Sequence, residues 1–281
     1  MSTPELPTRD LASRVADATR AIRARTDLAP RVGLTLGSGL GGVVDALEHP
    51  VVFPTATLPH WPASTVAGHA GRLALGHWQG VPVVALAGRS HRYEGYTLDR
   101  VTFGVRVMHA LGARTMIFTN AVGAIADFPP GDLMVATDHI NMIGRRGLFT
   151  AGELTERRAG RRVATYYTPV LRDELVAAAQ RAGVGLHRGV LMGGHGPTYE
   201  TAAEIRMAAK LGADVACMST VHEVTVAGEL GCRTASLSCI TNRATGLSPT
   251  RLTHEEVTEV AHRVAERLRA VLEEWLRAAG R

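Results

Sequence analysis

The sequence predicts an α/β fold of three layers, in which helices cover both faces of a central sheet. Two observations support this class: short apolar runs alternate with helical stretches, and helical patterns open and close the chain. With 281 residues, 46% of them hydrophobic, the chain can bury a large core. No repeat, low-complexity tract or long linker interrupts it, so we expect a single domain over residues 1–281.

Apolar residues at helical spacing predict a first helix over residues 11–22 and a last helix over 257–275. Between them, apolar runs predict strands at residues 32–36, 81–87, 115–119, 215–218 and 234–240. A helix over residues 101–111, ending at Gly112, is expected to connect two of these strands. We interpret the polar, Arg-rich stretch 145–162 as a long surface loop near a possible site.

Charge and cysteine content narrow the function classes. The 31 basic residues exceed the 26 acidic ones, giving a net charge of +5 that is spread along the chain rather than gathered in a basic run. This distribution favours small anionic ligands over nucleic acid. Cys217, Cys232 and Cys239 lack metal or redox spacing, which predicts reduced core residues in a cytoplasmic protein. The N-terminal region carries acidic residues and no run approaches the length of a membrane span, so neither secretion nor a membrane location is expected.

A glycine-rich turn, GSGLGG at residues 37–42, follows the first predicted strand and precedes an apolar segment. Its backbone N–H groups, placed at a helix N-terminus, could bind phosphate with help from the Ser38 hydroxyl. Dinucleotide binding would need an acidic residue about 20 positions later, where the chain reads TLPHWP. A Walker A loop would need a lysine, and the chain's one lysine is Lys210. The alternative is a tight turn that uses glycine for its backbone freedom.

A second candidate anion site is GRSHRYEGY, residues 88–96, directly after a predicted strand. Arg89 can bind phosphate oxygens through two nitrogens and His91 can add a donor, although a solvated loop is the alternative. His69, in the segment GHAG, could add a further donor to such a site, and the alternative is that it has only a structural role. The motif TNAVG at residues 119–123 ends another predicted strand, and its small residues would let a ligand approach the Ala121 backbone unless it is a simple turn.

Three further segments can recognise a heterocycle and a sugar. Tyr199 and Glu200 precede a predicted helix over 202–211. The Tyr199 ring can stack on a heterocycle, and the Glu200 carboxylate can accept hydrogen bonds from its N–H edge. The alternative is that Glu200 only complements the helix dipole. Met218 and Ser219 offer a thioether and a hydroxyl, or are a core residue and an N-cap. Asn242 follows the last strand and can face a donor and an acceptor together, or form a turn.

Taken in order, these segments resemble the trimeric purine nucleoside phosphorylases. The strings GSGLGG, GHAGRL, GRSHRYEGY, TNAVG, GPTYETAAEIRM, GADVACMSTVHEV, ITN and THEEV occur in the family's order, over nearly the whole chain. The resemblance implies a mixed sheet that curls into a partial barrel, and a homotrimer with sites near its interfaces. It implies inorganic phosphate as co-substrate, with no metal and no organic cofactor.

The resemblance also implies a role for each matching residue. Phosphate is expected to bind to Ser38, His69, Arg89, His91, the Ala121 backbone and Ser219. The ribose is expected to contact Tyr93, Met218 and His254. The purine is expected to contact Tyr199, Glu200 and Asn242. Asn242, Glu200 and His91 are the expected catalytic residues, because the reaction must stabilise the departing base above a bound anion.

The implied reaction is the phosphorolysis of 6-oxopurine nucleosides, inosine and guanosine. In the related methylthioadenosine phosphorylases an Asp takes the place of Asn242, which therefore indicates a 6-oxo substrate. A 5′-modified or 6-aminopurine nucleoside, or a non-catalytic nucleoside-binding role, remains an alternative.

The chain departs from the family pattern at several positions. Ala124, Leu191, His195 and His222 differ from the residues common in the family. The Arg-rich stretch also replaces the usual aromatic lid from the neighbouring subunit, of which Tyr167 alone matches.

Overall fold

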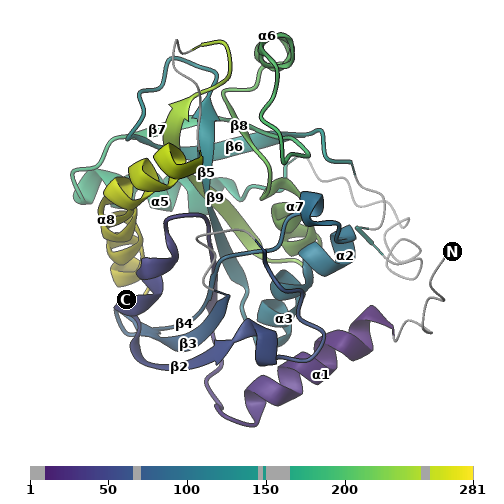
Figure 1. Cartoon of the computed structure of the whole chain (residues 1–281). Helices are drawn as coiled ribbons and strands as arrows, with labels where there is room; N and C mark the ends of the chain where they lie inside the picture. Colours follow the sequence, from purple (N-terminus) through teal and green to yellow (C-terminus); the bar gives the residue numbers. More distant parts are fainter. Residues whose placement is uncertain (1–9, 66–70, 145–147, 150–164, 248–253, 281) are drawn as a thin grey trace, which may run out of the picture.

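The computed structural model describes residues 10–65, 71–144, 148–149, 165–247 and 254–280, with the backbone alone for 254–258. Nine strands form one sheet in the order β2-β3-β4-β1-β5-β8-β7-β6-β9 (Figure 1). The strands are β1 Val32–Leu36, β2 Glu48–Pro54, β3 Arg72–Trp78, β4 Val81–Ala87, β5 Thr115–Ala124, β6 Leu133–Asn141, β7 Leu186–Gly193, β8 Val215–Cys217 and β9 Arg233–Arg243.

The sheet closes on itself through the pairing of β5 with β9. Strands β5, β8, β7, β6 and β9 thereby form a mixed five-stranded barrel, and β1, β4, β3 and β2 extend the sheet outside it. This confirms the expected mixed sheet with barrel curvature. The neighbouring strands β4, β1, β5 and β9 are parallel, so their carboxyl ends meet at one edge of the sheet, where α/β proteins bind ligands.

Helices cover both sides of this sheet (Figure 1). They are α1 Leu11–Arg23, α2 Leu98–Val101, α3 Phe103–Ala110, α5 Pro169–Arg181, α6 Ala202–Lys210, α7 Val221–Glu229 and α8 His254–Ala279. Helices α5 and α8 pack together against one side, and α1, α3 and α7 cover the other. The short 3₁₀ helices are η1 Gly41–Ala46, η2 Thr55–Thr57 and η3 Arg92–Glu94.

Strand β4 illustrates how the sheet separates two hydrophobic cores. Val84 and Leu86 face the core beneath α1, α3 and α7, whereas Val83 and Ala85 face the core beneath α5 and α8. Alternate residues of a strand point to opposite faces, so a strand covered on both sides must be apolar throughout. This is the reason that β1 and β4 were predicted with their observed bounds.

Several predicted elements differ from the structure. The strands expected at 115–119 and 234–240 are longer, because β5 continues to Ala124 and β9 runs from Arg233 to Arg243. The strand expected at 215–218 ends at Cys217, and the helix expected over 101–111 is split between α2 and α3 at Thr102. Strands β2, β3, β6 and β7 were not predicted, since polar residues or glycines interrupt them.

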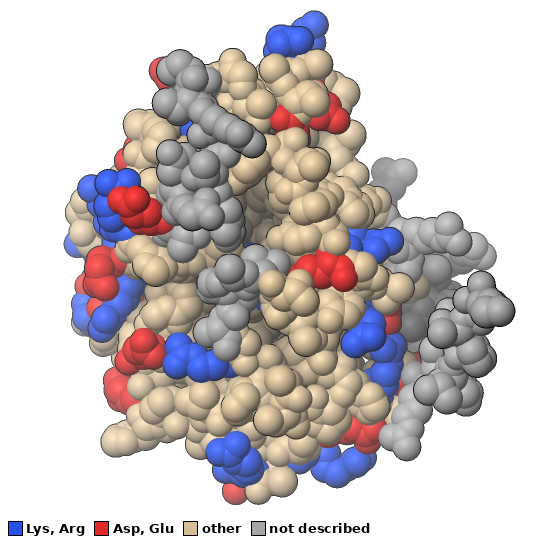
Figure 2. Space-filling view, viewed as in Figure 1, with Lys and Arg blue, Asp and Glu red and all other residues tan. Residues whose placement is uncertain are grey.

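The three cysteines are free and buried, as expected. Within the described ranges, no helix is long and apolar enough to cross a bilayer. In that same part of the chain, no three His, Cys, Asp or Glu side chains are arranged to hold a metal ion. On the face in Figure 2, basic and acidic side chains are interspersed around the periphery rather than gathered into one field.

Candidate active site

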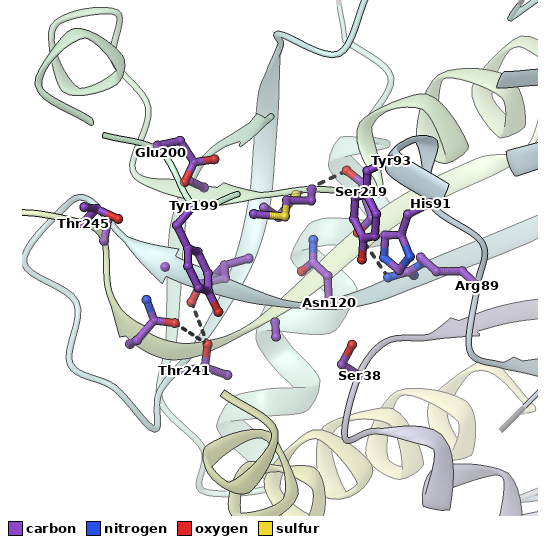
Figure 3. Close-up of a pocket in the computed structure, with 18 residues that line it drawn as sticks. Ser38, Arg89, His91, Tyr93, Asn120, Tyr199, Glu200, Ser219, Thr241 and Thr245 are labelled. Carbon is purple, nitrogen blue, oxygen red and sulfur yellow. Dashed lines mark hydrogen bonds between the residues drawn. The ribbon is translucent and has the colours of Figure 1, made fainter. Parts of the chain in front are cut away.

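One cavity at the carboxyl ends of the parallel strands gathers most of the predicted site residues (Figure 3). The predicted residues that line it are Ser38, Arg89, His91, Tyr93, Ala121, Tyr199, Glu200, Met218, Ser219 and Asn242. Its empty volume, including space open to solvent, is about 760 Å³, which suits a small-molecule ligand. His69 and the side chain of His254 lie outside the described residues, as does nearly all of the stretch 145–162.

Arg89 forms the centre of one end of the cavity. Its Nη2 donates to the Thr119 carbonyl at 2.8 Å and its Nη1 to the Ser219 hydroxyl at 3.4 Å. Its Nε lies 3.1 Å from the Glu223 carboxylate, and both side chains are almost fully buried. Because a buried carboxylate and two fixed acceptors orient the guanidinium, Arg89 presents a positive charge in one defined direction.

The loop after β8 holds Ser219 beside this guanidinium. Thr220 has a left-handed backbone with φ of 70° and is the N-cap of α7, where its N–H donates to Glu223 at 3.2 Å. The Ser219 and Thr220 hydroxyls lie 3.1 Å apart. Thr220, rather than Ser219, is therefore the cap, which leaves the Ser219 hydroxyl in the cavity.

The glycine turn differs from its predicted form. Six residues of 3₁₀ helix begin at Gly41, so no α-helix N-terminus stands behind Ser38. The turn instead allows a close approach: a Cβ on Gly37 would meet the Thr119 carbonyl at 2.9 Å and Arg89 Nη1 at 3.3 Å. Gly37 thus lets the β1 end lie against β5 and brings Ser38 to the same end of the cavity as Arg89 (Figure 3).

His91 and Tyr93 form a stacked pair over this end, with ring centroids 4.8 Å apart. Glu94 accepts from the His91 backbone N–H at 2.5 Å and lies 3.3 Å from its Nδ1. Burial opposes ionisation of Glu94, yet hydrogen bonds from His91 and Thr65 outweigh it and lower its pKa to about 2. Burial and the Glu94 charge raise the pKa of Tyr93 to about 12, so its hydroxyl stays protonated and can donate.

Glu200 and Tyr199 lie at the opposite end of the cavity (Figure 3). A Cβ on Gly194 would meet Glu200 Oε1 at 2.8 Å, so the absence of a side chain there makes room for the carboxylate. Helix α6 begins after its N-cap Thr201, so Glu200 lies one residue before the cap, and it lines the cavity. Burial raises the pKa of Glu200, because removing the carboxylate from water disfavours its charged form.

Asn242 lies within β9 rather than after it, with its side chain in the cavity. Its Oδ1 accepts from the Thr241 hydroxyl at 2.8 Å, and its Nδ2 donates to the Arg243 carbonyl at 2.9 Å. Because a carbonyl can only accept, the Arg243 carbonyl fixes which end of the amide is the donor, and the Thr241 hydroxyl lies beside the other end. The remaining lone pair of Oδ1 and second hydrogen of Nδ2 can face a ligand with both an acceptor and a donor.

Asn120 is a cavity residue to which sequence reasoning gave no role, although its motif was noted. It is 2% exposed, and its Nδ2 donates to Thr220 at 2.9 Å. Its Oδ1 is buried without a hydrogen-bond partner among the described residues, which leaves an acceptor for a ligand hydroxyl or proton. Thr241, Ala244 and Thr245 also line the cavity without having been assigned a role.

His222, a departure from the family pattern, is fully buried on α7, and both ring nitrogens lack hydrogen-bond partners within the described part of the chain. Burial, followed by the charges of Arg89 and His91, lowers its pKa to about 3. The unfolded chain binds a proton at this residue below about pH 6.5, whereas the folded protein does not until about pH 3. The free energy of unfolding therefore decreases as the pH is lowered from about 6.5 to about 3, by up to about 1.4 kcal/mol per pH unit.

Replacing His222 with leucine is expected to flatten this acid dependence. The free energy of unfolding, measured in urea at pH 6, 5 and 4, should decline less steeply than in the wild type, by up to about 1.4 kcal/mol per pH unit. The matched control His262→Leu changes an exposed histidine and should leave the slope as it is. Parallel slopes for the wild type and His222→Leu would contradict this account.

The two ends of the cavity offer complementary chemistry. At one end, Arg89, His91 and Ser219 present donors around a buried positive charge, a setting for a small oxyanion. At the other, an aromatic ring, a carboxylate and an oriented carboxamide can bind the edge and face of a planar heterocycle.

Comparisons with known proteins identify the family of this chain. The model of the Phosphorylase superfamily matches residues 31–277. Purine nucleoside phosphorylase 1 of Bacillus subtilis is 42% identical over 252 residues, which cover 89% of this chain and 93% of that protein. Two crystal structures of Schistosoma mansoni purine nucleoside phosphorylase cover 94% of this chain and 96% of theirs. The complex with adenosine has a TM-score of 0.86 at 32% identity, and the complex with inosine 0.85 at 30%. The chain belongs to the purine nucleoside phosphorylase family.

Proposed function

We propose that the protein catalyses the phosphorolysis of 6-oxopurine nucleosides, inosine and guanosine, to free base and ribose 1-phosphate. The observation that carries the proposal is the single cavity with an anion-binding end around Arg89 and a base-binding end formed by Glu200 and Asn242 (Figure 3). A non-catalytic nucleoside-binding protein would not need the first of these two ends.

In the proposed reaction, the bond between C1′ and N9 breaks and its electron pair moves onto the purine. Asn242 Nδ2 donates to O6, and its Oδ1 accepts from N7–H once N7 has taken a proton from solvent, while Glu200 accepts from N1–H. Both side chains thereby stabilise the departing base. Phosphate, held by Ser38, Arg89, His91, Ser219, His69 and the Ala121 backbone, forms the new bond to C1′. Its negative charge also offsets the positive charge that develops on the sugar.

The ribose would lie between these ends. The protonated Tyr93 hydroxyl can donate to a sugar oxygen, and Met218 offers an apolar contact beside it. Gly196 has φ of 67°, and a Cβ there would meet Met218 Sδ at 2.5 Å and the Tyr93 ring at 2.8 Å. The glycine therefore keeps Tyr93 and Met218 at this place in the cavity. We assign His254 to the 5′-hydroxyl.

The choice of base rests on Asn242 and not on the relatives, since the Schistosoma protein was crystallised with inosine and also with adenosine. An amide whose NH₂ group faces O6 would meet a second donor in a 6-aminopurine. Unpaired or opposed polar groups in a buried site can lower the specificity constant by orders of magnitude.

The test is release of base from inosine, guanosine, adenosine and methylthioadenosine, each with and without inorganic phosphate. We expect hypoxanthine and guanine to be released only with phosphate, and adenine to be released far more slowly. Release of hypoxanthine without phosphate would identify a hydrolase instead. A preference for methylthioadenosine would move the assignment to a 5′-modified substrate.

We further infer that residues 1–281 act as one domain in a cytoplasmic homotrimer. Two large apolar side chains are exposed on the helix that follows Glu200: Met207 on α6 and Leu211 at its C-cap. Their exposure supports burial of this face against another copy. The free, buried cysteines are compatible with a reducing compartment. The mass in solution, measured by light scattering, would distinguish a trimer from a monomer.

A further inference from the structure

A second cavity lies at the opposite edge of the sheet from the active site. It is lined by the first residues of β1, β4, β5 and β9, together with α5 and the end of α8. Its empty volume, including space open to solvent, is about 1290 Å³, larger than that of the active-site cavity. The same four strands end at the active site, and they are 5 to 11 residues long. At about 3.3 Å per residue, the two cavities are separated by roughly 15–35 Å, so they are distinct sites.

Three arginines enter this cavity from adjacent strand starts. Arg31 precedes β1, Arg114 precedes β5, and Arg233 begins β9. Strand pairing places them side by side: the Arg114 backbone N–H donates to the Arg31 carbonyl, and the Arg233 N–H donates to the Arg114 carbonyl at 2.8 Å. Arg181, from the last turn of α5, adds a fourth positive charge. Glu174 is the one acidic residue of the lining.

The existing contacts leave much of this positive charge unbalanced. Arg233 pairs with Glu174 at 2.6 Å, and Arg181 lies 3.4 Å from Glu274, beyond the lining. Arg114 donates to carbonyls at the end of α3. The Arg31 guanidinium has no hydrogen bond or ion pair to any residue that the structure describes. Arg31 and Arg114 therefore have no carboxylate partner among the described residues, so an anion placed in the hollow would meet a net positive charge.

The floor of the cavity is apolar. Val32, Val81 and Trp275 are buried there, and Ala177 and Ala278 present only methyl groups. Trp275 is fixed by its Nε1, which donates to Glu174 at 3.0 Å. The same carboxylate therefore holds both Trp275 and Arg233, so the cationic rim and the apolar floor are joined by one residue. A hollow with an apolar floor and a few charged groups at its rim has the composition of a small-molecule site.

We propose that this cavity binds an organic phosphate, a molecule in which one or more phosphate groups are joined to a planar ring, as in a nucleotide. Arginines suit phosphate because their planar forks donate two parallel hydrogen bonds to its oxygens. The ring would lie over the apolar floor, where methyl groups and the Trp275 side chain exclude water. Because the strands separate this site from the catalytic cavity, its ligand does not compete with the nucleoside.

Isothermal titration calorimetry with ATP, compared with inorganic tripolyphosphate, tests the proposal. We expect ATP to bind to the wild type and Arg31→Ala to raise its Kd about tenfold or more, as for loss of one charge-assisted contact. Arg263→Ala removes an equal charge from an exposed position outside the cavity and should change Kd less than twofold. Ala278→Trp fills the hollow without altering charge and should weaken binding as well. Tripolyphosphate should bind more weakly than ATP, because it lacks the ring.

Several outcomes would contradict the proposal. ATP could fail to bind to the wild type, Arg31→Ala could leave Kd unchanged, or Arg263→Ala could weaken binding as much as Arg31→Ala. Equal affinities for ATP and tripolyphosphate would exclude the ring contact. Base release from inosine is measured on the same samples, and both cavity variants should keep the kcat/KM of the wild type. A loss of ATP binding together with that activity would instead place the nucleotide in the active site and contradict a separate site.

Discussion

Replacing Arg89 with glutamine is expected to lower kcat/KM for phosphate by about 10²–10³-fold, the effect of removing a major donor to a reacting oxyanion. The guanidinium is held by the Thr119 carbonyl, the Ser219 hydroxyl and Glu223, so no other charged group can take its place without rebuilding this end of the cavity. Because the nucleoside binds at the other end, its own binding should change far less. Initial rates at varied phosphate and fixed saturating inosine give the required constants.

The variant also leaves the buried carboxylate of Glu223 without its cation, which costs about 3–5 kcal/mol of stability and could mimic a catalytic defect. The double variant Arg89→Gln/Glu223→Gln removes both charges. The glutamine at position 223 keeps an acceptor for the Thr220 N–H, so the cap of α7 is retained. Thermal denaturation should then recover most of the lost stability, while kcat/KM for phosphate stays low. Recovery of both quantities together would mean that Arg89 has a structural role and does not bind phosphate.

The strands that could be predicted from the sequence are those buried on both faces. β1 and β4 are continuous apolar runs, and their bounds were predicted correctly. β2 is an edge strand with several exposed residues, and β3 contains Gly76, so neither matches such a run. The ends of β5 and β9 were missed for a different reason. Asn120, Thr241 and Asn242 look like residues of a turn, but they belong to strands because barrel closure pairs β5 with β9 through this region.

The structure brings most of the expected site residues to one cavity, although the short motifs that contain them are far apart in the sequence. Arg89, Ser219 and Asn242 come from three separate segments, and only the resemblance to a family linked them before the structure placed them around one cavity. What the motifs could not provide is the support behind each side chain. The pairing of Arg89 with Glu223 and the hydrogen bond from Asn120 to Thr220 depend on how elements distant in the sequence pack, and no local pattern encodes them.

Asn242→Asp is expected to reverse the preference between the two purine types. The carboxylate has only acceptors, which suit a 6-amino group and repel the O6 of hypoxanthine. The structure adds a cost: the oxygen that replaces Nδ2 would face the Arg243 carbonyl, which now accepts at 2.9 Å, so the total activity should also fall. We expect kcat/KM for inosine to drop by about 10²–10³-fold, and the ratio of adenosine to inosine to rise by at least about 10²-fold.

Thr241→Val provides the matched control for this reversal. It removes the hydroxyl beside Asn242 Oδ1, but the Arg243 carbonyl still holds Nδ2, so the amide keeps its orientation and both its donor and its acceptor stay in the site. Base release from both nucleosides should therefore keep the wild-type preference. If Asn242→Asp kept the wild-type ratio of kcat/KM for inosine and adenosine, residue 242 would not discriminate between a 6-oxo and a 6-amino group of the purine. The carboxylate of Glu200 would then be expected to impose the 6-oxo preference by itself, because it accepts from N1–H, which is present in hypoxanthine and absent from adenine.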